Sequence, residues 1–378
     1  MNTNHINPFL TTGYTSKEYF CDRQNELQNL QRMLTNENNL TLISARRLGK
    51  SALIYRLFES LEEENYVCIY IDIFATVNLK DFIETLALAI FKRFPEKKNF
   101  GKRFLEFLKS FRPVISYDAL NGQPEIHFEF SRPADYEHTL RSIFRFLDSQ
   151  QVAVILAIDE FQQVTAYPET NTEALLRTII QTLQNIRFLF SGSKKHLMFD
   201  MFNTAKRPFF ASTQLVNLSE IPPLEYKKFI RSKFEEQRRT IDDESMDFIL
   251  SWTLTHTYYT QVICNQVFAQ KERHIGIEVV KRVCDELLKQ QQINFMQYRN
   301  LLAPLQWRLL IAIAKEGTLS EPQSQIFLQK YQIGAASSSK KALQSLLDKE
   351  MVCDVEMAGK IAYRIYDVFL LRWLERTF

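Results

Sequence analysis

The sequence has few cysteines, and their arrangement argues against the usual cysteine-based sites. They are Cys21, Cys68, Cys264, Cys284 and Cys353. Their odd number and the lack of any C-x-x-C pair argue against a disulfide framework and against a zinc site. The same pattern is typical of a reducing compartment, so we expect a cytoplasmic protein.

Long apolar runs are also lacking. No stretch reaches the roughly 18 apolar residues that a membrane-spanning helix requires, and the first residues do not resemble a signal peptide. We therefore expect a soluble protein that has no membrane partner.

The chain carries no large excess of charge of either sign. Its 47 basic and 44 acidic residues give a net charge of +3, too small to indicate nucleic-acid binding by charge alone. Apolar residues, in contrast, are abundant: they make up 46% of the 378 positions and include 30 phenylalanines. This length and composition predict a multidomain protein with more than one hydrophobic core.

One segment points to phosphate binding. It consists of Ser44, Ala45, Arg46, Arg47, Leu48, Gly49, Lys50 and Ser51, followed by Ala52. The segment matches the pattern G-x-x-x-x-G-K-[S/T] at every defined position except the first, where Ser44 replaces glycine. Apolar residues at 40–43 predict a buried strand before it, and those at 52–58 predict a helix after it. Backbone N–H groups at such a helix N-terminus bind phosphate, and we assign Lys50 to the β/γ-phosphates and Ser51 to Mg²⁺.

Two further apolar runs end in polar residues of matching chemistry. Residues 152–160 predict a central parallel strand that ends in two carboxylates. We assign Asp159 to Mg²⁺ and Glu160 to the general base that activates water. Residues 186–193 predict a neighbouring strand that places Ser191 or Ser193 near the γ-phosphate. The alternative for this Ser-Gly-Ser segment is a turn without a functional role.

Together these motifs resemble the archaeal ATPase family of AAA+/STAND-type ATPases, and the resemblance extends over most of the chain. Near the start it includes the Asn-Pro-Phe triplet at 7–9 and the box at 19–27; near the end it includes residues 363–374. The resemblance implies that Asn7, Phe9 and Arg23 lie beside the adenine and that the ligands are ATP, ADP and Mg²⁺.

Two departures from the family pattern concern catalysis and the lid. Ser212 occupies the position where the family usually has an arginine finger, so Arg207 or Lys206 of a neighbouring subunit would have to supply that charge, or hydrolysis would be slow. The lid motif G-x-P appears as Thr255-His256-Thr257. His256 is a candidate nucleotide contact, and the alternative is a packed or solvated histidine.

The order of the expected elements defines the fold. We predict an α/β P-loop domain of the AAA+ type with a parallel sheet at 1–223, a helical lid at 224–303 and a winged-helix domain at 304–378. Asn121-Gly122 lies between two alternating segments at 114–117 and 126–130, which predicts a hairpin inserted outside the parallel sheet.

The sequence of the predicted winged-helix domain does not decide between a DNA partner and a protein partner. The candidate recognition residues are Ser337, Ser338, Ser339, Lys340, Lys341 and Gln344. These residues fit DNA contact, but a winged helix can also bind a protein partner or inhibit its own ATPase. Three hypotheses follow: an ATPase that acts as a conformational switch, a nucleotide-gated protein-interaction module or homo-oligomer with negligible turnover, and an ATP-dependent DNA-binding factor.

Overall fold

The computed structural model describes residues 7–94, 99–111, 113–117, 124–130, 132–150, 152–357 and 359–378. The chain divides into two compact units. The first is Gly13–Glu220, and the second combines Ile221–Phe378 with the described part of Met1–Thr12. Each unit has its own hydrophobic core and is described separately below.

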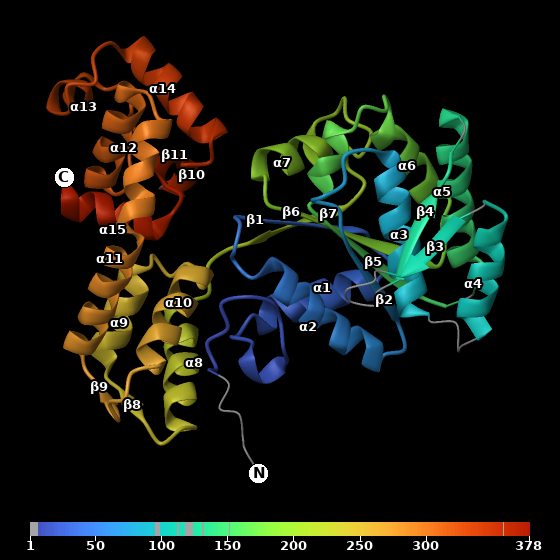
Figure 1. Ribbon diagram of the computed structural model, residues 1–378, viewed down its shortest axis with the longest axis horizontal. Helices are drawn as coiled ribbons and strands as arrows, with labels where there is room; N and C mark the ends of the chain where they lie inside the picture. The colour runs from blue at the N-terminus through green and yellow to red at the C-terminus, as the bar shows by residue number, and fades with distance from the viewer. Residues whose placement is uncertain are drawn as a thin grey trace. The chain divides into compact units, whose positions relative to one another are not determined.

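A five-stranded parallel sheet forms the centre of the first unit (Figure 1). The strands are β1 (Leu40–Ser44), β2 (Val67–Asp72), β5 (Val154–Asp159), β6 (Ile186–Gly192) and β7 (Gln214–Leu218), in the order β2-β5-β6-β1-β7. Every residue of β1 and β5 is buried, as their unbroken apolar runs predict. The predicted sheet is therefore confirmed.

Helices cover both faces of this sheet (Figure 1). On one face pack α1 (Gln24–Thr35) and α2 (Lys50–Glu63), through buried leucines that recur at helical spacing. The other face carries α3 (Leu79–Arg93), α4 (Asn99–Lys109), α5 (Pro133–Asp148), α6 (Thr172–Ile180) and α7 (Lys195–Asn203), with the short 3₁₀ segment η2 (Phe161–Ala166). A second 3₁₀ segment, η1 (Lys17–Tyr19), precedes α1. The result is a three-layer α/β/α arrangement.

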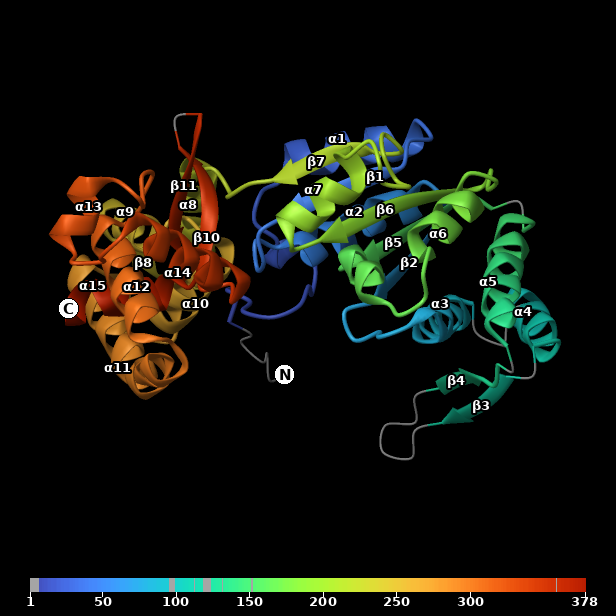
Figure 2. The same cartoon turned by 90° about the horizontal axis from the view of Figure 1, so that it is seen from above.

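The predicted hairpin is present. Strands β3 (Pro113–Tyr117) and β4 (Pro124–Phe128) pair antiparallel in a separate two-stranded sheet, which Figure 2 shows apart from the parallel one. Ile126 and Phe128 are buried in the core on the α3 side. The Asn121-Gly122 turn lies outside the described residues.

The second unit is mainly helical. Its first helices are α8 (Pro223–Glu235), α9 (Asp243–Trp252), α10 (Thr257–Phe268) and α11 (Ile277–Leu301), as predicted for a lid. A minimal parallel pair, β8 (Thr240–Ile241) and β9 (His274–Ile275), was not predicted, because two-residue strands leave no periodic pattern.

A three-helix and hairpin arrangement follows in the same unit. It comprises α12 (Pro304–Glu316), α13 (Gln325–Lys330), α14 (Ala336–Asp348), β10 (Val352–Met357) and β11 (Lys360–Ile365), which is the predicted winged-helix order. A final helix, α15 (Val368–Thr377), is capped by Asp367 and contacts both α11 and α12. Among the described helices, none combines the length and apolar composition needed to cross a membrane.

Candidate nucleotide site

The phosphate-binding segment connects the end of β1 to the start of α2. Ser44 is the buried last residue of β1, and its hydroxyl donates to the Ala45 carbonyl at 3.0 Å. The left-handed backbone conformations fall later, at Arg47 (φ 62°) and Gly49 (φ 92°). Serine is thus compatible with the first position of the motif, because that position is still strand, whereas Gly49 occupies a turn that suits glycine.

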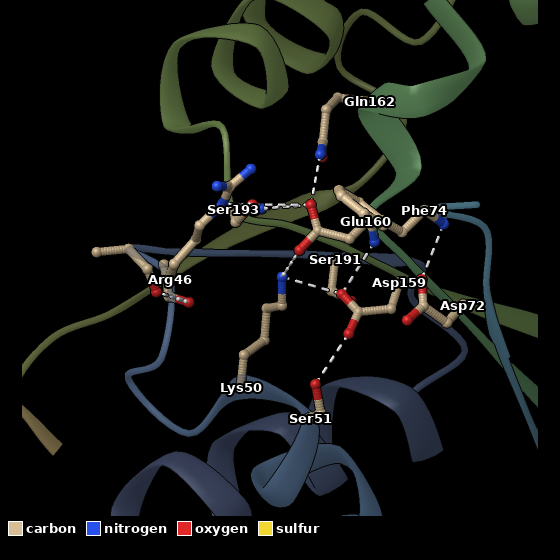
Figure 3. A network of polar contacts seen from close by, with 12 residues as sticks. Arg46, Lys50, Ser51, Asp72, Phe74, Asp159, Glu160, Gln162, Ser191 and Ser193 are labelled. Atoms are coloured by element: carbon tan, nitrogen blue, oxygen red, sulfur yellow. Dashed lines mark hydrogen bonds and ion pairs between the residues drawn. The ribbon is translucent and has the colours of Figure 1, made fainter. Parts of the chain in front are cut away.

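The Lys50 ammonium sits between two carboxylates. Its Nζ lies 2.9 Å from Asp159 Oδ1 and 3.2 Å from Glu160 Oε1, as Figure 3 shows. The Lys50 and Asp159 side chains are less than a tenth exposed. Since β5 is next to β6 and β6 is next to β1, the ends of these strands bring the motifs together although more than 100 residues separate them in the chain.

Asp159 accepts hydrogen bonds from several elements. Its Oδ2 accepts from Ser51 at 2.9 Å and from the Tyr70 hydroxyl at 2.7 Å, and its Oδ1 accepts from Ser191 at 2.6 Å. Burial raises the pKa of Asp159, but the Lys50 charge and the hydrogen bonds from Ser191 and Tyr70 outweigh it, and the pKa lies below its ordinary value. The carboxylate is therefore ionised at neutral pH.

Glu160 is held in a left-handed backbone conformation (φ 55°) directly after β5. Its Oε2 accepts from the Ser193 hydroxyl at 2.8 Å and from Gln162 Nε2 at 2.5 Å. Burial raises the pKa of Glu160, but the Lys50 charge and these hydrogen bonds outweigh burial, and the pKa lies below its ordinary value. The role of Glu160 as general base stays a prediction.

The Ser-Gly-Ser segment is not a turn. Ser191 and Gly192 are the last residues of β6, and the two serines on either side of Gly192 donate to Asp159 and Glu160. A side chain on Gly192 would force its neighbours to move, because a Cβ there would lie 2.1 Å from Gln162 Oε1 and 2.6 Å from Met198 Sδ. Glycine at this position thus fits the observed packing of Gln162 and Met198.

Two contributors to the site were missed in the sequence analysis. Tyr70 lies on β2, where a single tyrosine in an apolar strand reads as a core residue, and Gln162 lies in the short η2 segment. The available signal for Tyr70 was its position two residues before the polar end of a strand that pairs with β5, in register Tyr70 to Ala157. Only the tertiary pairing shows that its hydroxyl reaches Asp159.

Ser51 and Asp159 form an oxygen pair that fits Mg²⁺. Their oxygens are 2.9 Å apart at the start of α2 and the end of β5. Mg²⁺ is commonly held by one or two protein oxygens, water and substrate phosphates, and this pair supplies two such oxygens.

The other predicted contacts of the first unit lie around the loop. Leu48 is buried, and Ala52 belongs to the first turn of α2. Arg23 is buried and donates to the Leu48 carbonyl at 3.1 Å and to the Ser219 carbonyl at 2.8 Å, so it anchors the loop backbone. A contact of Arg23 with adenine stays a prediction.

Asn7, Phe9 and His256 belong to the second unit. The Asn7 side chain donates to the Asn265 carbonyl at 2.9 Å. Phe9 is fully buried, and its ring packs against Phe229, Phe234 and Phe268. His256 is buried at the start of α10 against Tyr259. Their roles as nucleotide contacts stay predictions.

The predicted arginine-finger region forms local ion pairs. Arg207 Nη2 lies 2.8 Å from Glu173 of α6, and its Nε lies 3.4 Å from Asp200 of α7. Ser212, at the position where an arginine was expected by resemblance, donates to the Phe209 carbonyl at 2.6 Å. A finger role for Arg207 would require it to leave these carboxylates.

The candidate recognition helix α14 presents only part of the predicted set. Ser339 is fully buried and donates to the Pro322 carbonyl at 2.8 Å, so its assignment to DNA reading is wrong. Its spacing places it on the core face of the helix. The exposed members are Ser337, Lys340, Lys341 and Gln344, with Ser338 half-buried.

Comparison with protein families matches two parts of the chain. Residues 20–259 match an ATPase domain found predominantly in Archaea, and residues 293–376 match a probable winged-helix domain. The first match covers the phosphate loop, both carboxylates and both serines of the site. A comparison with curated protein sequences finds no match.

Solved structures of similar fold cover nearly the whole chain. A Walker-type ATPase of Pyrococcus abyssi has a TM-score of 0.67 at 19% identity, covering 97% of this chain and 99% of that one. The ORC2 protein of Aeropyrum pernix, solved with ADPNP and ADP, has a TM-score of 0.59 at 13% identity over 98% and 96% of the chains. The ORC1 protein of the same organism, solved with DNA, has a TM-score of 0.50 at 12% identity over 95% and 93%. These similarities establish the fold.

Proposed function

The chain belongs to the family of ATPase domains found predominantly in Archaea, and we propose that it binds Mg²⁺–ATP and hydrolyses it slowly as a conformational switch. The observation that carries this proposal is the convergence of Lys50, Ser51, Asp159 and Glu160 at the ends of β1 and β5, with separations of 2.9 to 3.2 Å. A cation for phosphate, an oxygen pair for the metal and a carboxylate for water are the minimal set for phosphoryl transfer to water.

Lys50 links nucleotide binding to the chemistry of Glu160. When Lys50 turns to the β/γ-phosphates, it leaves the carboxylates that it contacts in the structure. The Glu160 carboxylate is then no longer paired with Lys50, while Gln162 and Ser193 still hold it by hydrogen bonds. It is thus positioned to accept the proton of the attacking water. Ser51 and Asp159 would hold Mg²⁺, which would neutralise charge on the phosphates.

Two substitutions test this assignment. Lys50→Ala should abolish detectable binding of a fluorescent ATP analogue, because it removes the cation that meets the phosphates. Glu160→Gln should keep that binding and lower multiple-turnover phosphate release by about 10²-fold or more, because the amide cannot accept a proton. The controls are Lys80→Ala and Glu63→Gln, which remove charges elsewhere on helices α3 and α2. Parent-like binding by Lys50→Ala would contradict the proposed site.

A second candidate function is ATP-dependent DNA binding through the winged helix. It is favoured by the exposed side chains of Lys340, Lys341 and Gln344 on α14. Acidic residues nearby, and the exposed apolar Met357 and Ile361 on the β10–β11 wing, instead suit a protein partner. The proposed test is duplex binding measured against salt concentration with and without ATP.

If the winged helix binds DNA, replacing Lys340 and Lys341 with alanine should weaken binding to all sequences alike. It should also make the slope of log K against log salt concentration shallower by about two, one for each lost phosphate contact. If no duplex binding is detected at low salt, with or without ATP, the DNA-binding candidate is wrong and a protein partner is the remaining alternative.

A further inference from the structure

Hydrolysis of ATP develops negative charge that the residues assigned so far do not fully offset. Lys50 is the one basic side chain that the proposed function assigns to the phosphates, and it faces two ionised carboxylates, Asp159 and Glu160. Many P-loop ATPases add an arginine for this purpose. In this chain Ser212 stands at the expected finger position, and Arg207 is paired with Glu173 and Asp200.

Arg46, within the phosphate loop itself, lies much closer to the reacting groups. Its Nε is 3.3 Å from Ser193 Oγ, and Ser193 in turn donates to Glu160 Oε2 at 2.8 Å. Figure 3 shows the Arg46 side chain reaching from the loop to the end of β6, beside the Glu160 carboxylate. One hydroxyl group therefore separates the guanidinium from the carboxylate assigned to activate water.

Two of the three basic residues of the loop lie on the sides of different oxygens of that carboxylate, Lys50 in direct contact and Arg46 through Ser193. Lys50 approaches Oε1 of Glu160, while the Arg46 and Ser193 pair approaches Oε2. The water that Glu160 activates must lie between this carboxylate and the γ-phosphate. A guanidinium next to Glu160 is therefore within reach of the γ-phosphate oxygens, and its planar donors suit two such oxygens at once.

We propose that Arg46 supplies, within the same subunit, the positive charge that stabilises the transition state of hydrolysis, an inference that rests on the proposed ATPase function. Water attacks the γ-phosphorus, and its proton passes to Glu160. The bond between that phosphorus and the β–γ bridging oxygen breaks, so ADP leaves with the electron pair and inorganic phosphate forms. Arg46 contacts the γ-phosphate oxygens as charge builds on them and so is a catalytic residue.

The neighbouring Arg47 offers a comparison within the loop, and Arg103 offers a control outside the site. Arg47 has the same charge as Arg46, but its side chain is exposed and its backbone is left-handed (φ 62°). Arg103 is exposed on α4. The variants to compare are Arg46→Ala, Arg46→Lys, Arg47→Ala, Arg207→Ala and Arg103→Ala. For each, we would measure phosphate release at saturating Mg²⁺–ATP, affinity for a fluorescent ATP analogue, and trapping of ADP with aluminium fluoride, an analogue of the transferring phosphoryl group.

Arg46→Ala should lower the turnover number by about 10²-fold or more, with analogue affinity within about threefold of the parent protein. It should also lose trapping of ADP with aluminium fluoride. Arg46→Lys should recover part of the rate. Arg47→Ala and Arg207→Ala should each lower the rate less than Arg46→Ala does, and Arg103→Ala should leave it unchanged. Mixing Arg46→Ala with Glu160→Gln protein should restore no activity, because both residues act in one subunit.

Three results would overturn the assignment of Arg46. They are a parent-like rate for Arg46→Ala, equal losses for Arg46→Ala and Arg47→Ala, and recovery of activity in the mixture. A parent protein that neither binds nor hydrolyses ATP would instead overturn the proposed function, and this inference with it.

Discussion

At the scale of single residues, Tyr70 shows how a buried hydroxyl supports the site. It donates to Asp159 Oδ2 at 2.7 Å, the oxygen that Ser51 also contacts, and its ring packs against Tyr55 with centroids 4.9 Å apart. Burial and the neighbouring Asp159 raise the pKa of Tyr70, so its hydroxyl keeps the proton that it donates. If Ser51 bound Mg²⁺, Tyr70 would still orient the Asp159 carboxylate.

Tyr70→Phe should therefore raise the Mg²⁺ concentration that gives half-maximal binding of the ATP analogue by about tenfold, a usual loss for a residue that orients a metal ligand. Binding measured without Mg²⁺ should change little. Tyr55→Phe is the matched control, since it removes a hydroxyl from the adjacent ring and leaves the bond to Asp159 intact. Equal Mg²⁺ dependence in both variants would show that Tyr70 only packs.

At the scale of elements, the connection between α9 and α10 departs from the family motif. Leu254 (φ 54°) and Thr255 (φ 56°) are consecutive residues in the left-handed region, and Thr255 stands where the family has glycine. The Thr255 N–H donates to the Leu250 carbonyl at 2.8 Å, which ends α9. A β-branched residue in this conformation is strained by about 1–2 kcal/mol.

Thr255→Gly should relieve that strain and raise the free energy of unfolding by up to about 1 kcal/mol, after the cost of the more flexible unfolded chain is subtracted. Denaturant unfolding monitored by circular dichroism measures this free energy of unfolding. Gln266→Gly, at an exposed position inside α10, should instead lower stability by about 1 kcal/mol. A loss of stability in Thr255→Gly would contradict the expected strain.

At the scale of the whole chain, α15 connects the winged-helix segment to the preceding helices of the second unit. Arg372 donates to the carbonyls of Ser251 and Trp252 at 3.0 and 2.8 Å, so a side chain of the last helix caps the end of α9. Trp252 also packs on Phe369 of α15, with ring centroids 5.8 Å apart. Trp252, the last residue of α9, lies two residues before Leu254, where the strained turn begins.

Arg372→Ala should lower the free energy of unfolding by about 2 kcal/mol, because two capping hydrogen bonds of a charged donor are lost. Arg376→Ala, one turn further along α15, removes an exposed pair with Asp285 and should cost less than about 1 kcal/mol. Thermal unfolding of the two variants under one buffer condition compares them. Equal shifts would mean that the cap contributes no more than a surface ion pair.

The sequence by itself determined the elements and the chemistry of the phosphate loop. Buried parallel strands are unbroken apolar runs, and the loop pattern needs residues adjacent in the chain, so both are visible without a structure. The helices of the lid and the winged helix follow from periodicity for the same reason. Helices α4, α5, α6, α7 and α15 and the two-residue strands were not predicted.

Only the tertiary structure decided which distant side chains meet. The order β2-β5-β6-β1 brings Tyr70, Ser191 and Lys50 onto Asp159, and no local pattern encodes that order. The fold also buried Ser339 and turned Arg46 toward Ser193 while Arg47 stays exposed. Side-chain direction depends on φ, ψ and packing, so two adjacent arginines with the same charge acquire different surroundings.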